Sequence, residues 1–285
     1  MRHPVSLQLH LLRVGACRHL ACMAARGDAW AVIDFPALCG LIRHPARGWL
    51  LYDTGYAAHF MDATQPWPER LYRTLLPVTL PPSEVLAHQL AGLGLTVDDV
   101  AHVVVSHFHG DHVAGLKDLP GAALYALGAD VEQVQALAGH RWRATLGGLL
   151  PGLLPADFGQ RLTRVETLAR RDLPGWLAPL AQGFDLFGDG SVLGVPLPGH
   201  SAGQLGLFLP DVEGRPVLLA GDACWSLPAL REGRLPAWPT LLATHDRRRY
   251  RATFEGLRRL VNREPALRLL PSHCSTAWEA YRDGR

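Results

Sequence analysis

The stretch VVVSHFHGDHVAGL, residues 103–116, places three histidines and an aspartate within six positions behind a run of valines. A short β-branched run of this kind is typical of a central strand that is buried on both faces. Because alternate side chains at a strand end point the same way, His107 and His109 can bind one metal ion. A bend after them turns Asp111 and His112 toward a second ion. Imidazole and carboxylate ligands suit zinc, and also iron or manganese.

Three later segments offer further metal ligands in the same kind of position. They are LPGHSAGQ with His200, LLAGDACW with Asp222 and LLPSHC with His273. In each of them an apolar run is followed by a turn residue and a ligand type. A pair of ions needs a bridging group and usually more histidines than one segment supplies. We therefore expect these three residues to lie at strand ends, where loops approach the first cluster.

The composition fits a single large α/β domain that spans residues 1–285. The chain is 48% hydrophobic and 19% charged, which is enough for one large core. Its net charge of +2 does not mark a binder of nucleic acid. No apolar stretch approaches the roughly 20 residues that span a bilayer, so no membrane association is expected. Five cysteines without a CxxC pair favour reduced thiols and a cytoplasmic location.

Strands and helices are predicted in both halves of the chain. Residues 35–55 are predicted to form two strands joined by a turn. Ser83 can cap a helix with an apolar stripe at Leu86 and Leu90. The arginine-rich stretch 246–259 carries apolar residues at helical spacing and indicates an amphipathic helix with a solvated basic face. Since the ligand types fall at strand ends in each half, the pattern favours two packed β-sheets with helices outside.

The order of the ligand-type residues resembles the metallo-β-lactamase superfamily. That family carries an HxHxDH motif, then a single histidine, a single aspartate and a final histidine. Seven positions match in type and order: His107, His109, Asp111, His112, His200, Asp222 and His273. The DTG sequence that begins at Asp53 also resembles the family's first motif. The resemblance covers nearly the whole chain, and it implies the α/β class with an αββα four-layer sandwich.

The resemblance also implies a role for each of these side chains. One divalent ion would be bound by His107, His109 and His200, and a second by Asp111, His112 and His273. Asp222 would bridge the two ions, which are expected to be zinc, with iron or manganese as alternatives. Asp53 would stand behind the metal ligands and orient them. Asp111 would also act in catalysis, by holding or relaying a proton.

A hydrolytic mechanism follows from two ions in such a site. Ions roughly 3.5–4 Å apart share a water molecule and lower its pKa toward about 7. The resulting hydroxide attacks the carbonyl of a lactone or related ester, and the ions stabilise the oxyanion. No serine or cysteine nucleophile is needed. The expected enzyme is a dinuclear metal-dependent hydrolase.

Within the superfamily the chain is most similar to the N-acyl-homoserine lactone lactonases. The similarity lies in IRHPARGWLLYDTGY, SHFHGDHVAGLKDLPGA and PLPGHSAGQLGL, and in the aspartate at the bridging position. Those lactonases often have a tyrosine three residues after that aspartate, where it can touch the lactone carbonyl. Here this position is Trp225, whose indole N–H donates a hydrogen bond but cannot act as a phenol. Trp225 is predicted to contact the substrate or to form a wall of the pocket.

The expected partner is a small-molecule ester or lactone, with an acyl-homoserine lactone as one candidate. Apolar segments around Trp67 and between Leu149 and Leu154 are predicted to line a cleft for an apolar tail. Two alternatives stay open. A thioester hydrolase of the glyoxalase II type would share the metal ligands, although no clear basic cluster for a glutathione carboxylate is seen. A mononuclear iron enzyme similar to persulfide dioxygenases is the other. The sequence is compatible with a homodimer and does not determine the oligomeric state.

Overall fold

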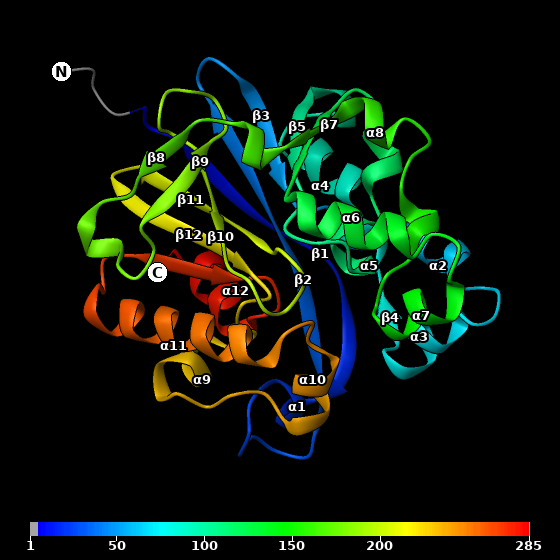
Figure 1. Ribbon diagram of the computed structural model, residues 1–285. Coiled ribbons are helices and arrows are strands. Elements are labelled where there is room, and N and C mark those ends of the chain that lie inside the picture. The colour runs from blue at the N-terminus through cyan, green and yellow to red at the C-terminus, as the bar shows by residue number, and fades with distance from the viewer. Residues whose placement is uncertain (1–4, 285) are drawn as a thin grey trace.

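The computed structural model describes residues 5–284, and two β-sheets form its centre (Figure 1). Within these residues the first sheet has the strand order β4-β1-β2-β3-β5-β6-β7. Its strands are β1 Gln8–Leu20, β2 Val32–His44, β3 Gly48–Tyr52, β4 Val78–Thr79, β5 Val100–Val104, β6 Ala123–Ala126 and β7 Leu162–Arg164. The second sheet has the order β13-β12-β11-β10-β9-β8. Its strands are β8 Arg170–Asp172, β9 Gln182–Asp185, β10 Leu193–Pro196, β11 Leu205–Val212, β12 Arg215–Gly221 and β13 Arg268–Pro271.

Alternate residues of the central strands face opposite sides of the first sheet. In β3 and β5, Leu50 and Val104 lie in the apolar layer between the two sheets, whereas Leu51 and Val103 lie in the apolar layer behind the first sheet. All four side chains are fully buried. The valine run is therefore buried on both faces, as predicted, because each face packs against a different apolar layer.

The helices lie outside the sheets and in the connections between strands. They are α1 Ala21–Ala24, α2 Ala58–Ala63, α3 Arg70–Leu75, α4 Leu86–Gly92, α5 Gly110–Val113, α6 Gly128–Ala136, α7 Arg141–Leu146, α8 Phe158–Arg161, α9 Leu227–Glu232, α10 Trp238–Ala243, α11 Arg247–Arg263 and α12 Ser275–Arg282.

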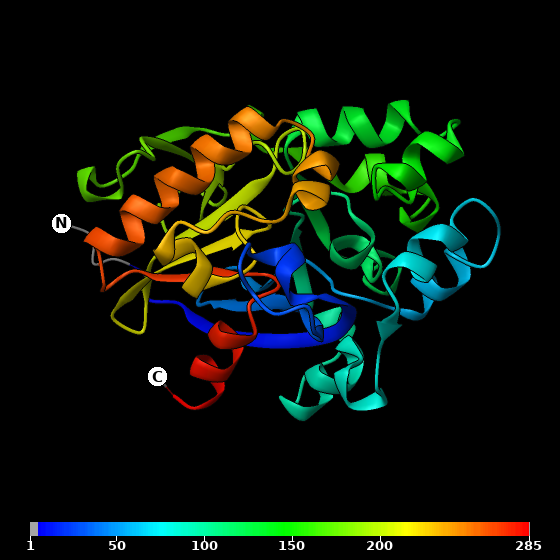
Figure 2. The same cartoon turned by 90° about the horizontal axis from the view of Figure 1, so that it is seen from below.

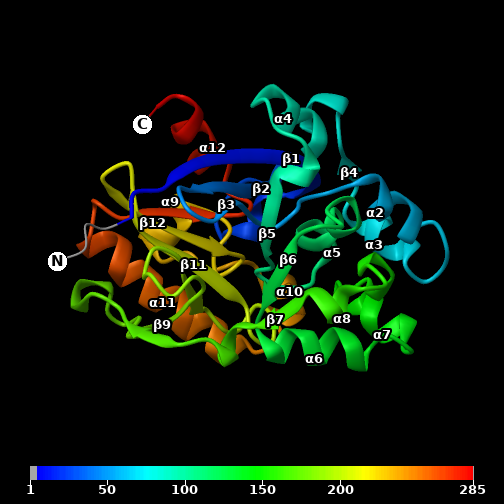
Figure 3. The same cartoon turned by 90° about the horizontal axis from the view of Figure 1, so that it is seen from above.

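Helices cover the outer face of each sheet, as the two turned views show (Figures 2 and 3). On the second sheet, the long helix α11 packs Tyr250 and Phe254 against Phe208 of β11. On the first sheet, α4 packs Leu86 and Leu90 into the apolar layer behind it. The order of layers is helix, sheet, sheet, helix, so the predicted α/β class and αββα four-layer sandwich are confirmed.

Most of the predicted elements are present, with one wrong helix cap. Residues 35–55 contain β2 and β3, which pair as an antiparallel hairpin. The arginine-rich stretch forms α11, whose apolar face is buried. Ser83, however, does not cap α4. The pair Pro81 and Pro82 starts a 3₁₀ turn that encloses Ser83, and α4 begins only after Val85, whose side chain makes no capping bond.

Strands of both sheets end at one side of the molecule. β3 pairs in parallel with β5, and β12 pairs in parallel with β13. Parallel neighbours end at the same edge, so the residues that follow these strands are brought together there. A direct bond joins the two sheets close by, where the Tyr52 hydroxyl donates to the carbonyl of Leu205 at 2.8 Å. The ends of the four strands therefore converge on one site.

Three further predictions concern the whole chain. All five cysteines are buried and free of disulfides. Among residues 5–284, none of the helices combines the length and the apolar character needed to cross a membrane. The predicted domain span of 1–285 includes residues 1–4 and 285, which lie outside the described residues, and the single-domain assignment stays a prediction.

Candidate metal centre

The predicted metal ligands meet in two sets at these strand ends. The first set is His107, His109 and His200, and the second set is Asp111, His112 and His273. With Asp222 added to the first set, the ligand atoms within each set lie within 4.8 Å of one another. His107 and His109 follow β5, and His200 lies in the loop between β10 and β11. Asp222 follows β12, and His273 follows β13. All seven predicted side chains are thus brought together.

Asp222 lies between the two sets. Its Oδ1 is 3.4 Å from Nε2 of His112, and its Oδ2 is 3.3 Å from Nε2 of His200. The same Oδ2 is 3.2 Å from Nε2 of His273. One buried carboxylate therefore reaches histidines of both sets, which is the geometry required of a bridging group.

A sharp bend separates the two sets within the first motif. His109 has an extended backbone, and the short helix α5 begins at the next residue, Gly110. A Cβ atom at Gly110 would lie only 2.8 Å from the ring of Phe60, so a larger residue would not fit without movement. The bend separates Asp111 and His112 from His109 along the chain, and together with His273 they form the second set.

Asp53 fixes the position of His112 from behind. Its Oδ2 lies 2.8 Å from Nδ1 of His112, and its Oδ1 accepts the backbone N–H of Ser106 at 2.7 Å. A carboxylate accepts, so Nδ1 of His112 carries the proton and Nε2 is left for the site. Asp53 has a left-handed backbone with φ of 59°, which aspartate tolerates better than most residues.

Replacement of Asp53 by asparagine should weaken metal binding while the fold persists. Asparagine has the same shape and tolerates the left-handed backbone, but it cannot hold the His112 N–H as a charged acceptor. Loss of such a supporting group typically costs about 10- to 100-fold in metal affinity. Competition with a chromophoric chelator measures the metal affinity of wild type and variant. Asp189→Asn is the matched control, because Asp189 contacts His44 at 3.0 Å outside the site; equal weakening in both variants would contradict the role.

Two other histidines are fixed by neighbours in the same way. Nδ1 of His273 lies 2.8 Å from the carbonyl oxygen of Pro36, which can only accept, so Nδ1 carries the proton. The hydroxyl of Ser106 lies 3.0 Å from Nδ1 of His107. Both contacts leave Nε2 of the ring directed at the site.

The polar atoms left over at the site fit bound metal ions. Three buried atoms at the site have no hydrogen-bond partner among the described residues: Nε2 of His107, Nε2 of His112 and Oδ1 of Asp222. Unpaired buried polar groups are costly and rare in native proteins. Histidine nitrogens and carboxylate oxygens are ligands for zinc and related divalent metals. The residues present therefore fit the ions that the sequence predicts.

A family model described as the metallo-beta-lactamase superfamily matches residues 32–273, which is most of the chain. The chain belongs to the metallo-β-lactamase superfamily. The matched range contains the six residues of the two sets and also Asp222. The superfamily assignment and the geometry therefore cover the same site.

Relatives of this superfamily member include named lactonases. The N-acyl homoserine lactonase AttM of Azorhizobium caulinodans is 26% identical over 289 residues, which cover 97% of this chain and 96% of that protein. The probable metallo-hydrolase Rv2300c of Mycobacterium tuberculosis is 31% identical over 180 residues, or 62% of this chain. The chain spans about half the length of that relative, since the match covers 53% of it.

Solved structures of the superfamily share the fold. An N-acyl homoserine lactone hydrolase with the product N-hexanoyl-L-homoserine bound at its catalytic metal center has a TM-score of 0.70 at 17% identity, over 98% of this chain and 97% of that one. AidC, a dizinc quorum-quenching lactonase, has a TM-score of 0.63 at 16% identity, over 96% and 90% of the chains. The predicted superfamily and the predicted similarity to lactonases are confirmed by the family model and by AttM, and the solved structures share the fold.

The histidines of the first set are held neutral. Burial lowers the pKa of His107 well below its ordinary value, lowers that of His109, and brings that of His200 to about 3. A metal-binding imidazole has to be neutral. The first set is therefore ready to bind metal at pH 7 without losing protons.

The histidines of the second set are held protonated when no metal is bound. Burial on its own lowers their pKa, but carboxylates outweigh it. Asp111, Asp53 and Asp222 raise the pKa of His112 to about 10, and Asp222 and Asp111 raise that of His273 to about 9. Burial acts to raise the pKa of Asp222, but His273 and His112 hold it well below its usual range. Metal binding to the second set therefore has to displace protons.

The pH dependence of metal binding should report this difference. We expect about two protons to be released per chain when the second set fills at pH 7, and the affinity of that set to rise about tenfold per pH unit for each proton. Calorimetric titration in buffers of different ionisation enthalpy counts these protons. Metal uptake that releases no protons at pH 7 would contradict the assignment.

The same shifts set the stability of the metal-free protein. The raised pKa values of His112 and His273 add stability that is complete below about 6.5 and is lost as the pH rises through about 9 and 10. The lowered pKa values of His107, His109 and His200 act in the opposite direction. They make the metal-free protein less stable as the pH falls below about 6.5.

Two polar side chains outside the sets face the centre. The ring of Trp225 lies 5.9 Å from that of His200 and 6.0 Å from that of His273 between centroids, and its buried Nε1 has no partner among the described residues. The Tyr72 hydroxyl lies 3.5 Å from Oδ1 of Asp111. Sequence reasoning missed Tyr72, because it lies in α3, in a stretch with weak periodicity and no ligand motif.

A cavity of about 430 Å³ lies beside the first motif. It is lined by Leu150, Pro151 and Gly152, from the segment predicted to form an apolar cleft, and the Leu150 side chain lies against Gly110. Charged groups, among them Glu69 and Arg141, form other parts of the wall. Trp67 is 55% exposed. The cavity is therefore mixed in polarity rather than apolar.

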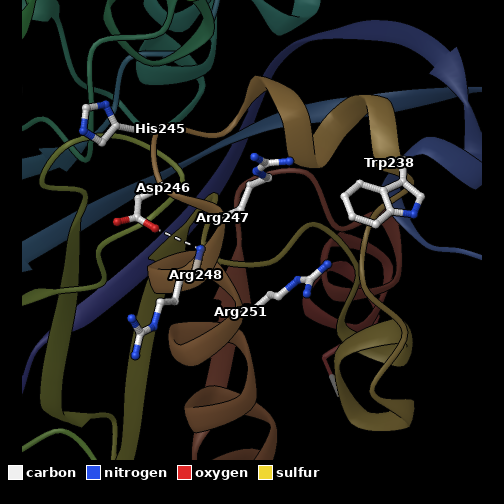
Figure 4. A pocket seen from close by; sticks show the side chains of 6 residues that line it. All are labelled: Trp238, His245, Asp246, Arg247, Arg248 and Arg251. Atoms are coloured by element: carbon white, nitrogen blue, oxygen red, sulfur yellow. Dashed lines mark hydrogen bonds between the residues drawn. The ribbon is translucent and has the colours of Figure 1, made fainter.

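A second cavity of about 560 Å³ lies at the start of α11 (Figure 4). Its lining residues are Trp238, His245, Asp246, Arg247, Arg248 and Arg251. Asp246 caps the helix by accepting the backbone N–H groups of Arg248 and Arg249 at 2.9 and 3.0 Å. One lining residue, His245, is joined to the His200 loop, since its backbone N–H donates to the His200 carbonyl at 3.0 Å. Arg247, Arg248 and Arg251 are exposed, as the predicted solvated face requires, and they line part of this surface hollow.

Proposed function

We propose that the protein is a dinuclear metal-dependent hydrolase that opens a lactone or related ester, with acyl-homoserine lactones as the first candidate substrates. The observation that carries the proposal is the position of Asp222, whose carboxylate lies 3.2–3.4 Å from histidines of both sets. Full-length similarity to a relative named as an N-acyl homoserine lactonase supports the substrate class.

The two sets would each hold one divalent ion, with Asp222 between them. Zinc is the expected metal, and iron or manganese would suit the same ligands. When bound, the two ions would supply the Lewis acidity that makes water a nucleophile near neutral pH and polarises a carbonyl.

The protein's own groups would orient the reactants and move the proton. Asp53 holds the His112 ring in place at 2.8 Å. Asp111 would hold the proton released from the attacking water and pass it to the leaving oxygen. The O–H of Tyr72 and the N–H of Trp225 would donate hydrogen bonds to the substrate. Both lie beside the centre, and preorganised donors of this kind stabilise developing negative charge on oxygen.

A substrate panel tests the proposal. Purified protein loaded with zinc, iron or manganese would be assayed with acyl-homoserine lactones, simple esters, thioesters, phosphodiesters and β-lactams. Turnover of lactones or esters is the expected result. Turnover of phosphodiesters alone would rule out the ester proposal, and one iron per chain with oxygen consumption would favour a dioxygenase instead.

The cavity in Figure 4 favours a second candidate, the hydrolysis of an ester or thioester that carries an anionic group. Arg247, Arg248 and Arg251 line it, and guanidinium groups bind carboxylates and phosphates well. The sequence shows this arginine run but does not indicate that it lines a cavity. An acidic thioester in the panel, compared with its neutral amide analogue, separates this candidate from a neutral lactone.

We also place the enzyme in the cytoplasm, because its buried cysteines are free of disulfides. Small molecules, rather than nucleic acid, are the proposed partners, in line with the net charge of +2. Size-exclusion chromatography with light scattering would decide whether the protein is a homodimer.

A further inference from the structure

Asp130 is a buried carboxylate that the proposed chemistry does not use. It lies in the first turn of α6 and is only 3% exposed. Its Oδ1 accepts the backbone N–H of Gly203 at 3.0 Å, and its Oδ2 accepts that of Gln204 at 2.7 Å. Both residues belong to the loop that connects β10 to β11 and carries His200. A side chain that follows a strand of the first sheet therefore holds a loop of the second sheet.

The held loop is tightly built around this contact. A Cβ atom at Gly203 would lie 2.9 Å from Oδ2 of Asp130, so the close approach depends on glycine. Gln204 has a positive φ of 31°, which is uncommon for a residue other than glycine. Its side-chain amide donates to the carbonyl of Ala220 at 3.1 Å. The contact from Asp130 thus continues to β12, close to Asp222.

Backbone amides hold the Asp130 carboxylate, and no arginine or lysine pairs with it within residues 5–284. Burial raises the pKa of Asp130 to about 6, although the Gly203 N–H, the Ser201 hydroxyl, the Gln204 N–H and the nearby His245 act to lower it. A buried carboxylate without a cationic partner is costly. The Asp130 carboxylate is satisfied by the loop that it holds, because one backbone N–H of that loop donates to each of its two oxygens.

We propose that Asp130 is a positioning residue that fixes the His200 loop and thereby sets the metal affinity of the first set. None of the second set, which is Asp111, His112 and His273, lies on the His200 loop that Asp130 holds. The inference rests on the proposed function only in that the two sets bind metal ions.

Cobalt(II) titration of the metal-free protein tests the inference without any turnover. Visible absorption and elemental analysis would follow the binding of each ion in wild type, in Asp130→Asn and in Glu132→Gln. Glu132 is the matched control, because it lies on the same helix and is exposed. We expect Asp130→Asn to weaken one of two cobalt sites about 10- to 100-fold and to leave the other unchanged. Hydrogen exchange should speed up at the amides of Gly203 and Gln204.

A second variant covers the case in which Asp130→Asn does not fold. Gly203→Ala pushes against the Asp130 carboxylate without changing its charge, and it should weaken the same cobalt site. Unchanged cobalt affinity in the folded variants, or equal weakening of both sites, would overturn the inference. Uptake of a single cobalt by wild type would instead contradict the dinuclear proposal. In that case the affinity of this one ion in Asp130→Asn and Glu132→Gln still decides the role of Asp130.

Discussion

Replacement of Asp222 by alanine is expected to remove activity and metal together. The carboxylate reaches His112, His200 and His273 within 3.4 Å, so its loss would leave both sets without the oxygen ligand that we propose they share. Groups that only support metal ligands already account for about 10- to 100-fold in affinity or activity. A direct ligand to both ions should account for more, on the order of a thousandfold or greater in kcat/KM. Elemental analysis and the lactone assay measure the two effects.

Asp211→Ala is the control for this experiment. Asp211 lies near the end of β11 and accepts the backbone N–H of Gly214, which lies in the turn to β12. Asp211 belongs to neither set. It should retain both metal and activity. Full activity in Asp222→Ala would remove the bridging role, whereas loss of activity with two ions still bound would show that the carboxylate acts in the reaction rather than in binding.

Gly199→Ala is expected to be strongly destabilising. Its backbone φ is +129°, and a Cβ atom there would lie 2.1 Å from the backbone nitrogen of Tyr250 and 2.3 Å from its Cα. Backbone atoms at the start of a helix cannot move aside as a flexible side chain can. We expect the free energy of unfolding to fall by about 3 kcal/mol or more. Urea unfolding of the metal-free protein measures this without interference from metal loss.

Gly214→Ala separates the close contact from backbone strain. Gly214 also has a positive φ of 85°, but nothing lies within 4 Å of a Cβ placed there. In Gly214→Ala the free energy of unfolding should fall only by the cost of a left-handed backbone at alanine, of order 1–3 kcal/mol. If the two variants unfold at the same urea concentration, the contact with Tyr250 contributes nothing. Because His200 follows Gly199 directly, Gly199→Ala should also bind metal less tightly.

The sequence was informative where chemistry and local structure coincide. His107 and His109 follow a strand that is visible as a run of valines, and Asp222 and His273 follow apolar runs of the same kind. The two sheets and the outer helix α11 follow from periodicity. The pairing of distant strand ends does not follow from any local pattern, and the family resemblance supplied it.

Residues that act through tertiary contacts could not be found in this way. Tyr72 and Asp130 lie on helices with no motif. Tyr72 reaches Asp111, and Asp130 reaches the His200 loop, only because the chain folds back. Ser83 was assigned as a helix cap because local rules ignore the 3₁₀ turn that its proline neighbours start. Most arginines of α11 are exposed, as the sequence predicts, but the sequence does not reveal that Trp238 and His245 line a cavity together with three of them.

The parallel ends of β3 and β5 in one sheet and of β12 and β13 in the other have a mechanical consequence. Each proposed ion would join side chains from both sheets, and so would act as a removable cross-link between segments far apart in the chain. Stripping the metal should therefore loosen the docking of one sheet on the other before either sheet melts. Proteases would then be expected to cut first in the connection between β7 and β8, which passes from the first sheet to the second.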